Sequence, residues 1–437
     1  MNRKLAAGAI AIGMIAVAGC APSGGSSDDV TLVVFGPNQF NTIPPNATKE
    51  VYTKIQDQLA EGFQKQHPEV TKIVFDAQGT FENEVSRTQN AQLAGEQMDV
   101  VVCAGNPTNT SYAPLGLLEP LDDLAGEVKG RLTEGALDAF TIDGTVWGIP
   151  LSGVAVTTFF YNKTLFDELG IAAPETYEEF VAAAPKISAA GVKPVAHNGK
   201  DLWMWPIWYM SGLAQTTDGA QLDKTIDNLK GKTKFTDDED VKALELTRRW
   251  MDDGLLSPSV MDLDAEGLAS SFLRGESASY FGASWDLPAL RERVTDFELG
   301  IFLFPEYASV GNPSLAFGGI ENGLCVAKSS KHKELAKDFI RYVTDDANAK
   351  TVLEGITPVA TSHLVYAGSD DPISQQIRDQ YLPASKFLDW VWPRELNDAI
   401  QRNIQAMMAD SLSPKEAAQK IQEAYERLVS DGYEYGK

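Results

Sequence analysis

The chain has 437 residues, of which 43% are hydrophobic, so it can bury more than one core and is not a disordered protein. Its formal net charge of −24 argues against a nucleic-acid-binding protein and against electrostatic attachment to an anionic membrane. Roughly 410 residues follow the N-terminal leader described next, and this length predicts two domains.

The first residues have the order of a secretion signal. Residues 1–19 begin with Arg3 and Lys4, continue with an apolar run too short to cross a bilayer as a helix, and end in small residues before Cys20. This order predicts cleavage before Cys20 and a lipid on its side chain; the alternative is a buried helix with an incidental cysteine. Residues 20–29 would form a flexible tether. We therefore expect an extracytoplasmic protein that is attached to the cell membrane by its lipid alone.

Strands and helices alternate in the first part of the body. Runs of β-branched residues predict strands at 30–36, 70–75 and 98–103, and an apolar period of 3.6 residues predicts helices at 49–66 and 81–94. This alternation is typical of an α/β domain with a mainly parallel sheet. In such sheets, ligands bind beyond the carboxyl ends of the strands.

Turn and capping signals divide the rest of the chain. Asp143-Gly144 between apolar residues predicts a hairpin at 141–150. Thr176 with Glu179 predicts a capping box at the start of a helix. A strand is expected at 154–161, and helices at 165–169, 176–187, 241–251, 265–273, 333–343, 394–408 and after Ser413.

The order of these segments resembles the extracellular solute-binding proteins of sugar importers, the group that includes maltose-binding protein. The likeness covers essentially the whole body and is carried by motifs in one order, such as Tyr-Asn-Lys-Thr-Leu-Phe at 161–166 and Glu-Leu-Ala-Lys-Asp-Phe at 334–339. Further motifs lie at 95–101, 118–124, 143–150 and 272–278.

The resemblance implies an α/β, two-lobed periplasmic-binding-protein-like fold of type II. Each lobe would be a mainly parallel sheet flanked by helices, with the ligand cleft between the lobes. Lobe 1 would comprise residues 30–145 plus 282–345, and lobe 2 residues 146–281 plus 346–437. The hinge would pass near 143–151, 280–282 and 342–347.

The eight tryptophans are the main physical indication of a ligand. Aromatic rings stack on the C–H face of a pyranose, and a few polar groups beside them bind its hydroxyls. The segment around Pro206 is denser in aromatic residues than a core helix requires, and Pro206 is expected to interrupt a regular helix there. We predict that Trp203 or Trp205 lies in the cleft, and we assign Trp208 and Trp250 to the core.

Further candidates come from the resemblance. It places Trp285 against the ligand, together with one of Trp390 and Trp392. Asp286 would either bind sugar hydroxyls or cap the following helix. Gly319 belongs to a glycine pair that would face the cleft, or serve a tight turn.

Amide side chains after two predicted strands complete the candidate site. Asn38 and Gln39 follow the first strand, and Asn106 follows the third. Amides both donate and accept hydrogen bonds, which suits hydroxyl groups, although each could also be a turn residue. Cys103 and Cys325 lie in apolar runs that predict buried thiols; a disulfide between them remains open.

These features favour the substrate-binding subunit of a carbohydrate ABC importer, a monomer that captures a mono- or oligosaccharide by lobe closure and delivers it to the membrane permease. No motif selects a catalytic carboxylate pair, a metal site, a cofactor site or a phosphate loop, so a secreted glycoside-active enzyme is a remote alternative. Residues 152–155 lack an acid that some sugar binders of this group carry, which argues against maltodextrin. The main alternative is a protein of the same fold for a non-sugar solute, such as a polyamine or phosphate ester.

Overall fold

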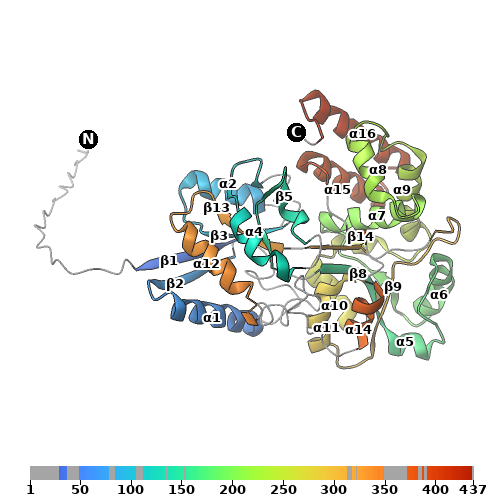
Figure 1. Cartoon of the computed structure of the whole chain (residues 1–437). Helices are drawn as coiled ribbons and strands as arrows, with labels where there is room; N and C mark the ends of the chain where they lie inside the picture. Colours follow the sequence, from blue (N-terminus) through green and yellow to red (C-terminus); the bar gives the residue numbers. More distant parts are fainter. Residues whose placement is uncertain are drawn as a thin grey trace, which may run out of the picture.

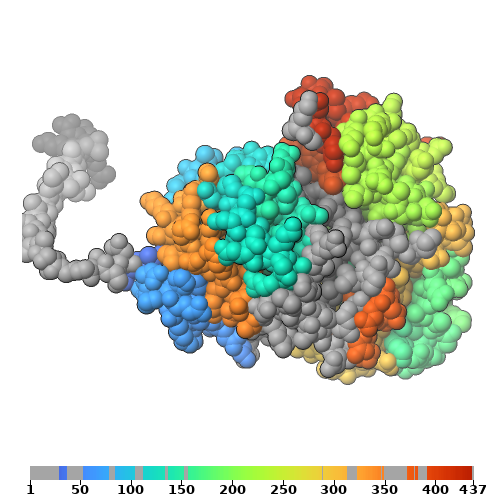
Figure 2. Space-filling view, in the orientation of Figure 1, coloured from blue at the N-terminus to red at the C-terminus, as the bar shows by residue number. Residues whose placement is uncertain are grey.

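The computed structural model has two lobes that lie side by side (Figure 1). In the space-filling view, the described residues of the two lobes form separate coloured bodies (Figure 2). The structure describes residues 29–36, 49–77, 84–104, 112–132, 136–151, 154–312, 317–320, 322–345, 347–348, 372–381, 386–387 and 391–435.

Lobe 1 is built on a sheet with the strand order β2-β1-β3-β13-β4, in which β7 also pairs with β13. β1 runs parallel to β2 and β3, whereas β13 runs antiparallel to its neighbours. The strands are β1 (Val30–Phe35), β2 (Val70–Asp76), β3 (Val100–Ala104), β4 (Leu118–Glu119), β7 (Ile149–Pro150) and β13 (Asn322–Ala327).

Both faces of this sheet are covered, as the continuous apolar run of β1 predicts. Leu32 and Val34 of β1 pack with α1, α4 and α12 on one face, and Val33 and Phe35 pack with α2 on the other. Alternate side chains of a strand point to opposite faces, so one short strand serves two cores. The helices are α1 (Lys49–Gln66), α2 (Glu84–Ala94), α4 (Asp122–Val128) and α12 (Lys333–Val343).

Lobe 2 is built on a sheet with the order β14-β12-β8-β10-β9, in which β11 also pairs with β8. β9 is parallel to β10, but β8 is antiparallel to β10, β11 and β12, so this sheet is mixed rather than mainly parallel. The strands are β8 (Val154–Asn162), β9 (Lys193–Ala196), β10 (Ser277–Ala283), β11 (Leu299–Phe302), β12 (Phe317–Ile320) and β14 (Lys386–Phe387).

The helices of lobe 2 follow most of the predicted boundaries. Thr176 and Glu179 form the expected capping box. A second capping box joins Ser413 and Glu416 at the start of the last helix. The helices are α5 (Lys163–Glu168), α6 (Tyr177–Ala189), α7 (Trp205–Thr216), α8 (Gln221–Leu229), α9 (Asp238–Asp252), α10 (Ala265–Leu273), α11 (Leu287–Arg293), α14 (Pro372–Gln376), α15 (Arg394–Met408) and α16 (Pro414–Ser430). Among the helices that the structure describes, none combines the length and apolarity needed to cross a bilayer.

The prediction that Pro206 interrupts a helix is wrong. Pro206 is the second residue of α7, where a missing backbone N–H leaves no helical hydrogen bond unmade. Residues 205–215 of this helix are all buried, and it packs against α9 and α15. The density of aromatic residues in this segment therefore belongs to the core of lobe 2.

The described strands show that the chain passes between the two sheets three times: two passages are closely spaced, and the third lies between β13 of lobe 1 and β14 of lobe 2. It leaves lobe 1 after β7 and enters lobe 2 at β8, and it returns between β12 and β13. The predicted boundary at residue 282 is therefore wrong: β11 and β12 pair with β8, so the chain stays in lobe 2 until Ile320. The hinge expected at 280–282 lies inside β10.

Cys103 and Cys325 form a disulfide between the adjacent strands β3 and β13, with their Cα atoms 6.1 Å apart. Both are fully buried, so the prediction of buried positions is confirmed and that of free thiols is wrong. The predicted hairpin, β5 (Thr141–Ile142) and β6 (Thr145–Val146), is followed by Gly148, where an added Cβ would lie 2.9 Å from Cys325 Sγ. Glycine at this position lets the chain lie directly on the disulfide.

Candidate functional site

One edge of the lobe 2 sheet faces lobe 1. The end of β10 lies beside the beginning of β8, where Ala283 pairs with Thr157, and the end of β12 lies there too, where Ile320 pairs with Val154. The chain crosses between the lobes at these ends of β8 and β12. The carboxyl ends of the parallel strands β9 and β10 therefore lie at the side of lobe 2 where ligands of α/β sheets bind.

A pocket of about 40 Å³ lies at this edge. Its walls come from the segment after β9, the beginning of α10, the end of β10 and two short helical turns, η4 (Leu202–Met204) and η6 (Ser284–Asp286). The lining residues are Asn198, Trp203, Met204, Ala265, Leu268, Ala269, Tyr280, Phe281, Gly282, Trp285 and Asp286.

Two of the predicted tryptophans meet in this pocket. Trp203 on η4 and Trp285 on η6 have ring centroids 6.0 Å apart, with their planes inclined by 57°. Both side chains are partly exposed. The two indoles thus offer neighbouring apolar surfaces at the side that faces lobe 1, although the residues are far apart in sequence.

Asn198 is a pocket residue that the sequence reasoning missed. Its side chain is 3% exposed, and its Nδ2 donates to Asp201 Oδ2 at 2.9 Å, which fixes the orientation of the amide. Its Oδ1 is buried and has no hydrogen-bond partner among the described residues. An unmet buried acceptor costs about 1–3 kcal/mol. The rule that selected Asn38, a polar residue just beyond a strand, also selects Asn198 once β9 is known.

Asp286 occupies the position before α11, but its side chain makes no capping hydrogen bond. The capping alternative is therefore wrong, and the carboxylate lies instead against Gly282, where an added Cβ would collide with it. Burial and the nearby Asp286 carboxylate raise the pKa of the Tyr280 phenol well above its ordinary value, so this phenol stays neutral.

The structure places Trp205 and Trp392 in the core rather than in the pocket, so of Trp203 and Trp205 it is Trp203 that lines the pocket, and Trp392 is not the stacking residue of its pair. Trp205 is fully buried, and its Nε1 donates to the Gly199 carbonyl at 2.9 Å. Trp392 is 1% exposed and stacks on Tyr209 at a centroid distance of 6.4 Å. Both belong to the core around α7, because that helix is buried on every side.

That core also holds Trp208 and Trp250, as predicted. Trp208 Nε1 donates to His197 Nδ1 at 3.3 Å. Burial lowers the pKa of His197 to about 3, so its imidazole is neutral at physiological pH. This histidine precedes Asn198, and its ring packs edge-on against the indoles of Trp205 and Trp208.

Several predicted residues lie outside the described residues: Asn38, Gln39, Asn106, Trp390 and Cys20. The strands that lead to the first three are described. Ala104 at the end of β3 pairs with Asn322, the first residue after the crossing from lobe 2. The carboxyl edge of the lobe 1 sheet therefore faces lobe 2. Gly319 lies in β12 and pairs with Ala155 of β8.

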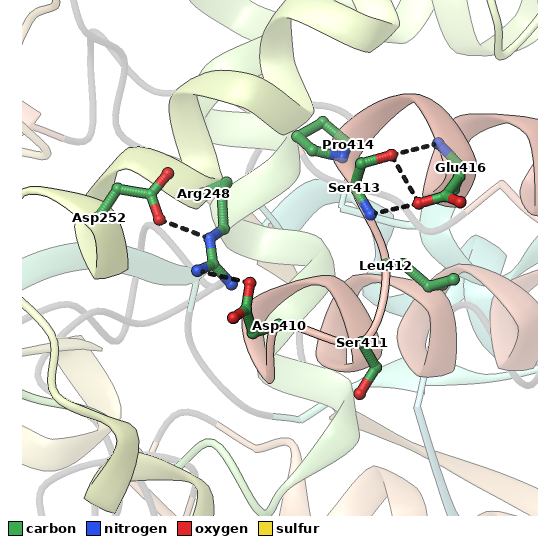
Figure 3. A pocket seen from close by; sticks show the side chains of 8 residues that line it. All are labelled: Arg248, Asp252, Asp410, Ser411, Leu412, Ser413, Pro414 and Glu416. Atoms are coloured by element: carbon green, nitrogen blue, oxygen red, sulfur yellow. Dashed lines mark hydrogen bonds and ion pairs between the residues drawn. The ribbon is translucent and has the colours of Figure 1, made fainter.

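A second hollow, of about 340 Å³, lies where α9 meets the turn between α15 and α16 (Figure 3). Arg248 occupies it, and its guanidinium contacts Asp252 at 2.8 Å and Asp410 at 3.2 Å. The same group donates to the carbonyls of Met407 and Met408, which end α15. A cation that satisfies terminal carbonyls stabilises a helix end, so we assign this hollow to structure. Within the described residues, no group of three or more His, Cys, Asp or Glu side chains has a metal-binding arrangement.

The sequence profile of the bacterial extracellular solute-binding proteins matches residues 58–375. The chain belongs to this family. The solute-binding protein is 26% identical over 365 residues to the diacetylchitobiose binding protein DasA of Streptomyces coelicolor, which covers 79% of each chain. It is 28% identical over 211 residues to the multiple sugar-binding protein of Streptococcus mutans, covering 47% of this chain and 49% of that one. Three putative binding proteins of Brucella are matched over 63% of their length, so the chain spans about half to five-eighths of these first curated relatives.

Solved structures of similar proteins confirm the two-lobed α/β fold. A chitin oligosaccharide binding protein superposes with a TM-score of 0.77 at 23% identity, covering 92% of this chain and 99% of that one. A solute-binding protein in complex with raffinose superposes with a TM-score of 0.70 at 21% identity, covering 91% and 99%. Membership in an extracellular family agrees with an extracytoplasmic location.

Proposed function

We propose that this solute-binding protein is the sugar-capturing subunit of an ABC importer, and that it binds a mono- or oligosaccharide between its lobes without altering it. The observation that carries this proposal is the pairing of Trp203 and Trp285 beside the unpartnered acceptor of Asn198. Apolar rings beside a hydrogen-bonding group match the two kinds of surface of a pyranose. The sugar ligands named for DasA and for the Streptococcus mutans relative support the same class.

Lobe 1 supplies the second wall in this proposal. Small-molecule sites usually enclose roughly 300–1,000 Å³, whereas the lobe 2 pocket has about 40 Å³. A sugar that contacts both lobes binds the closed form better than the open form, and this difference in affinity moves the equilibrium toward closure. Asn38, Gln39 and Asn106 follow the strands whose ends face lobe 2, and we propose them as the polar groups of that wall.

The remaining parts of the proposal concern the surroundings of the protein. A lipid on Cys20 would hold the protein on the outer face of the membrane, with residues 21–29 as the tether. The closed monomer would present both lobes to the permease subunits, and another subunit would hydrolyse ATP.

Isothermal titration of the purified protein against a panel of saccharides tests the proposal. We expect at least one saccharide to release or absorb heat, and Trp203→Ala and Trp285→Ala to weaken its binding at least about tenfold, as the loss of an aromatic anchor does. Tyr435→Ala removes an aromatic ring at the C-terminus and serves as the control, with unchanged affinity expected. Heat from a phosphate ester alone, with none from any saccharide, would contradict the proposal.

A cationic amine is the second candidate, since the Asp286 carboxylate lies in the same pocket as two indoles. Indole faces and a carboxylate attract ammonium groups. Putrescine and spermidine therefore belong in the same titration. Tight binding of either, with no binding of a saccharide, would assign the protein to polyamines.

A further inference from the structure

We propose that Asn198 is a specificity-determining residue that selects hexopyranose units, because the lobe 2 pocket accepts the exocyclic hydroxymethyl arm of the ring. This inference rests on the proposed function and names the feature of the sugar that the pocket recognises. It joins three observations: the size of the pocket, the apolar groups on its walls, and the unmet acceptor of Asn198, one of its lining residues.

The size of the pocket limits what can enter. Its volume of about 40 Å³ admits a few atoms and excludes a whole sugar ring. The ring itself therefore lies at the mouth, against the partly exposed indoles of Trp203 and Trp285, and only a substituent goes deeper. Met204, Leu268 and Ala269 line the pocket with apolar groups, which suit a methylene carbon.

The polar groups decide the chemistry of the tip of that substituent. Asn198 Oδ1 is buried and accepts no hydrogen bond within the described residues, while the amide nitrogen already donates to Asp201. No Lys, Arg or His lines the pocket among these residues, and the only carboxylate among its lining residues is that of Asp286. The group that reaches Asn198 must therefore donate a hydrogen bond and carry no negative charge. A primary hydroxyl at the end of one methylene meets both requirements.

The same chemistry rejects close relatives of a hexose. A pentopyranose has no arm at this position and leaves Asn198 unpaired, and buried groups left unpaired discriminate strongly against a ligand. A uronic acid carries a carboxylate, which cannot donate and is repelled by Asp286. An acetamido group is larger and ends in a methyl, so its tip cannot donate to Asn198.

Titration of the purified protein with matched pairs of sugars tests the inference. D-glucose and D-xylose, D-galactose and L-arabinose, and cellobiose and xylobiose differ within each pair only in the hydroxymethyl groups. We expect the hexose member of a bound pair to bind at least about tenfold more tightly. Asn198→Leu should weaken the hexose and leave the pentose unchanged, which removes the preference. Ala265→Val, at the beginning of α10, narrows the pocket and should act in the same direction.

The outcomes separate this inference from the proposed function. A pentose that binds as tightly as its hexose partner overturns the inference and leaves sugar binding intact. Retention of the hexose preference in folded Asn198→Leu, judged by an unchanged melting temperature, overturns the role of Asn198. Absence of binding by every saccharide overturns both proposals. The comparison of pairs on the wild-type protein needs no variant, so it remains decisive if Asn198→Leu fails to fold.

Discussion

Asp99 shows how one buried side chain can join three segments of lobe 1. It is fully buried, and its carboxylate accepts hydrogen bonds from Val33 N at 2.9 Å, Gln97 Nε2 at 2.8 Å and Ser330 Oγ at 2.6 Å. The backbone N–H of Asp99 donates in turn to the Val33 carbonyl. These bonds tie the beginning of β3 to β1 and to the turn after β13.

Asp99→Ala should therefore destabilise the protein by about 3 kcal/mol, because it leaves several buried donors unpaired. The free energy of unfolding in urea measures the loss. Asp138→Ala removes an exposed carboxylate of the same lobe and serves as the control, with a change below about 0.5 kcal/mol expected. A loss for Asp99→Ala no larger than that of the control would show that the network does not stabilise the fold.

His197 should make stability depend on pH. Burial lowers its pKa to about 3 in the folded protein, against 6.5 in the unfolded chain. The unfolded chain alone gains a proton below about pH 6.5, so this stabilisation is complete above that pH and is lost as pH falls toward 3. At pH 5 the loss is about 2 kcal/mol. Asp240 acts in the opposite direction, because burial raises its pKa to about 6 and its contribution is lost as pH rises through that value.

The contribution of His197 is isolated by comparing wild type with His197→Gln in urea at pH 7.5 and pH 5. The variant should lose about 2 kcal/mol less than wild type on acidification, although it is less stable at pH 7.5. Equal losses in the two proteins would mean that His197 is not kept neutral by the fold.

The site was predictable from the sequence only in part. Trp203 and Trp285 stand out as aromatic residues beside turns, and the structure brings them together. Trp205 and Trp392 have the same local signature but are core residues, because whether such a side chain packs inward depends on its tertiary neighbours. Asn198 was missed because the short strand before it, β9, was not predicted, and the rule that selects polar residues beyond strands therefore had no strand to apply to.

Among the secondary-structure elements, the helices with one apolar stripe were the most predictable. α10, α12 and α15 begin and end at the predicted residues, since their apolar residues recur with the helical period. α7 is apolar all round and has no stripe, so its sequence resembles a pocket wall as much as a helix. The apolar period of an amphipathic helix was therefore enough to predict the helix and its ends. The apolar composition of the fully buried helix α7 was not enough to predict it.

The disulfide between β3 and β13 should contribute strongly to the stability of lobe 1. It joins residues 222 positions apart, and closing a long loop in the unfolded chain removes much of its entropy. Replacing both Cys103 and Cys325 by Ala should lower the unfolding free energy by about 3 kcal/mol. Wild-type protein whose disulfide has been reduced by a thiol in denaturant and which is then refolded should also melt at a lower temperature than the oxidised protein, which measures the same stabilisation independently. No change in either experiment would indicate that the pairing of β3 with β13 needs no covalent support.

Over the whole molecule, the sequence predicted two lobes but not where the chain passes between them. Nothing in the short sequences of β11 and β12 assigns them to either lobe, and only their pairing with β8 places them in lobe 2. Pairing between strands that are far apart in the sequence cannot be read from the residues of either strand alone. The crossings before β8 and after β12 lie at the same edge as the Trp203–Trp285 pocket, so a change in backbone angles there moves lobe 1 relative to the pocket.

This geometry makes closure the property of the whole molecule that is most open to test. Because the crossings before β8 and after β12 are adjacent, we expect the lobes to rotate about them without disturbing either core, and a saccharide that contacts both lobes to favour the compact form by its differential affinity. Small-angle scattering should show a smaller radius of gyration at saturating saccharide. Trp285→Ala at the same saccharide concentration should keep the larger radius, because the pocket has lost one wall while the crossings are intact. An unchanged radius of gyration in wild type at proven saturation would mean that the ligand binds to lobe 2 alone. The transport proposal would then lack the change in shape by which a permease distinguishes loaded from empty protein.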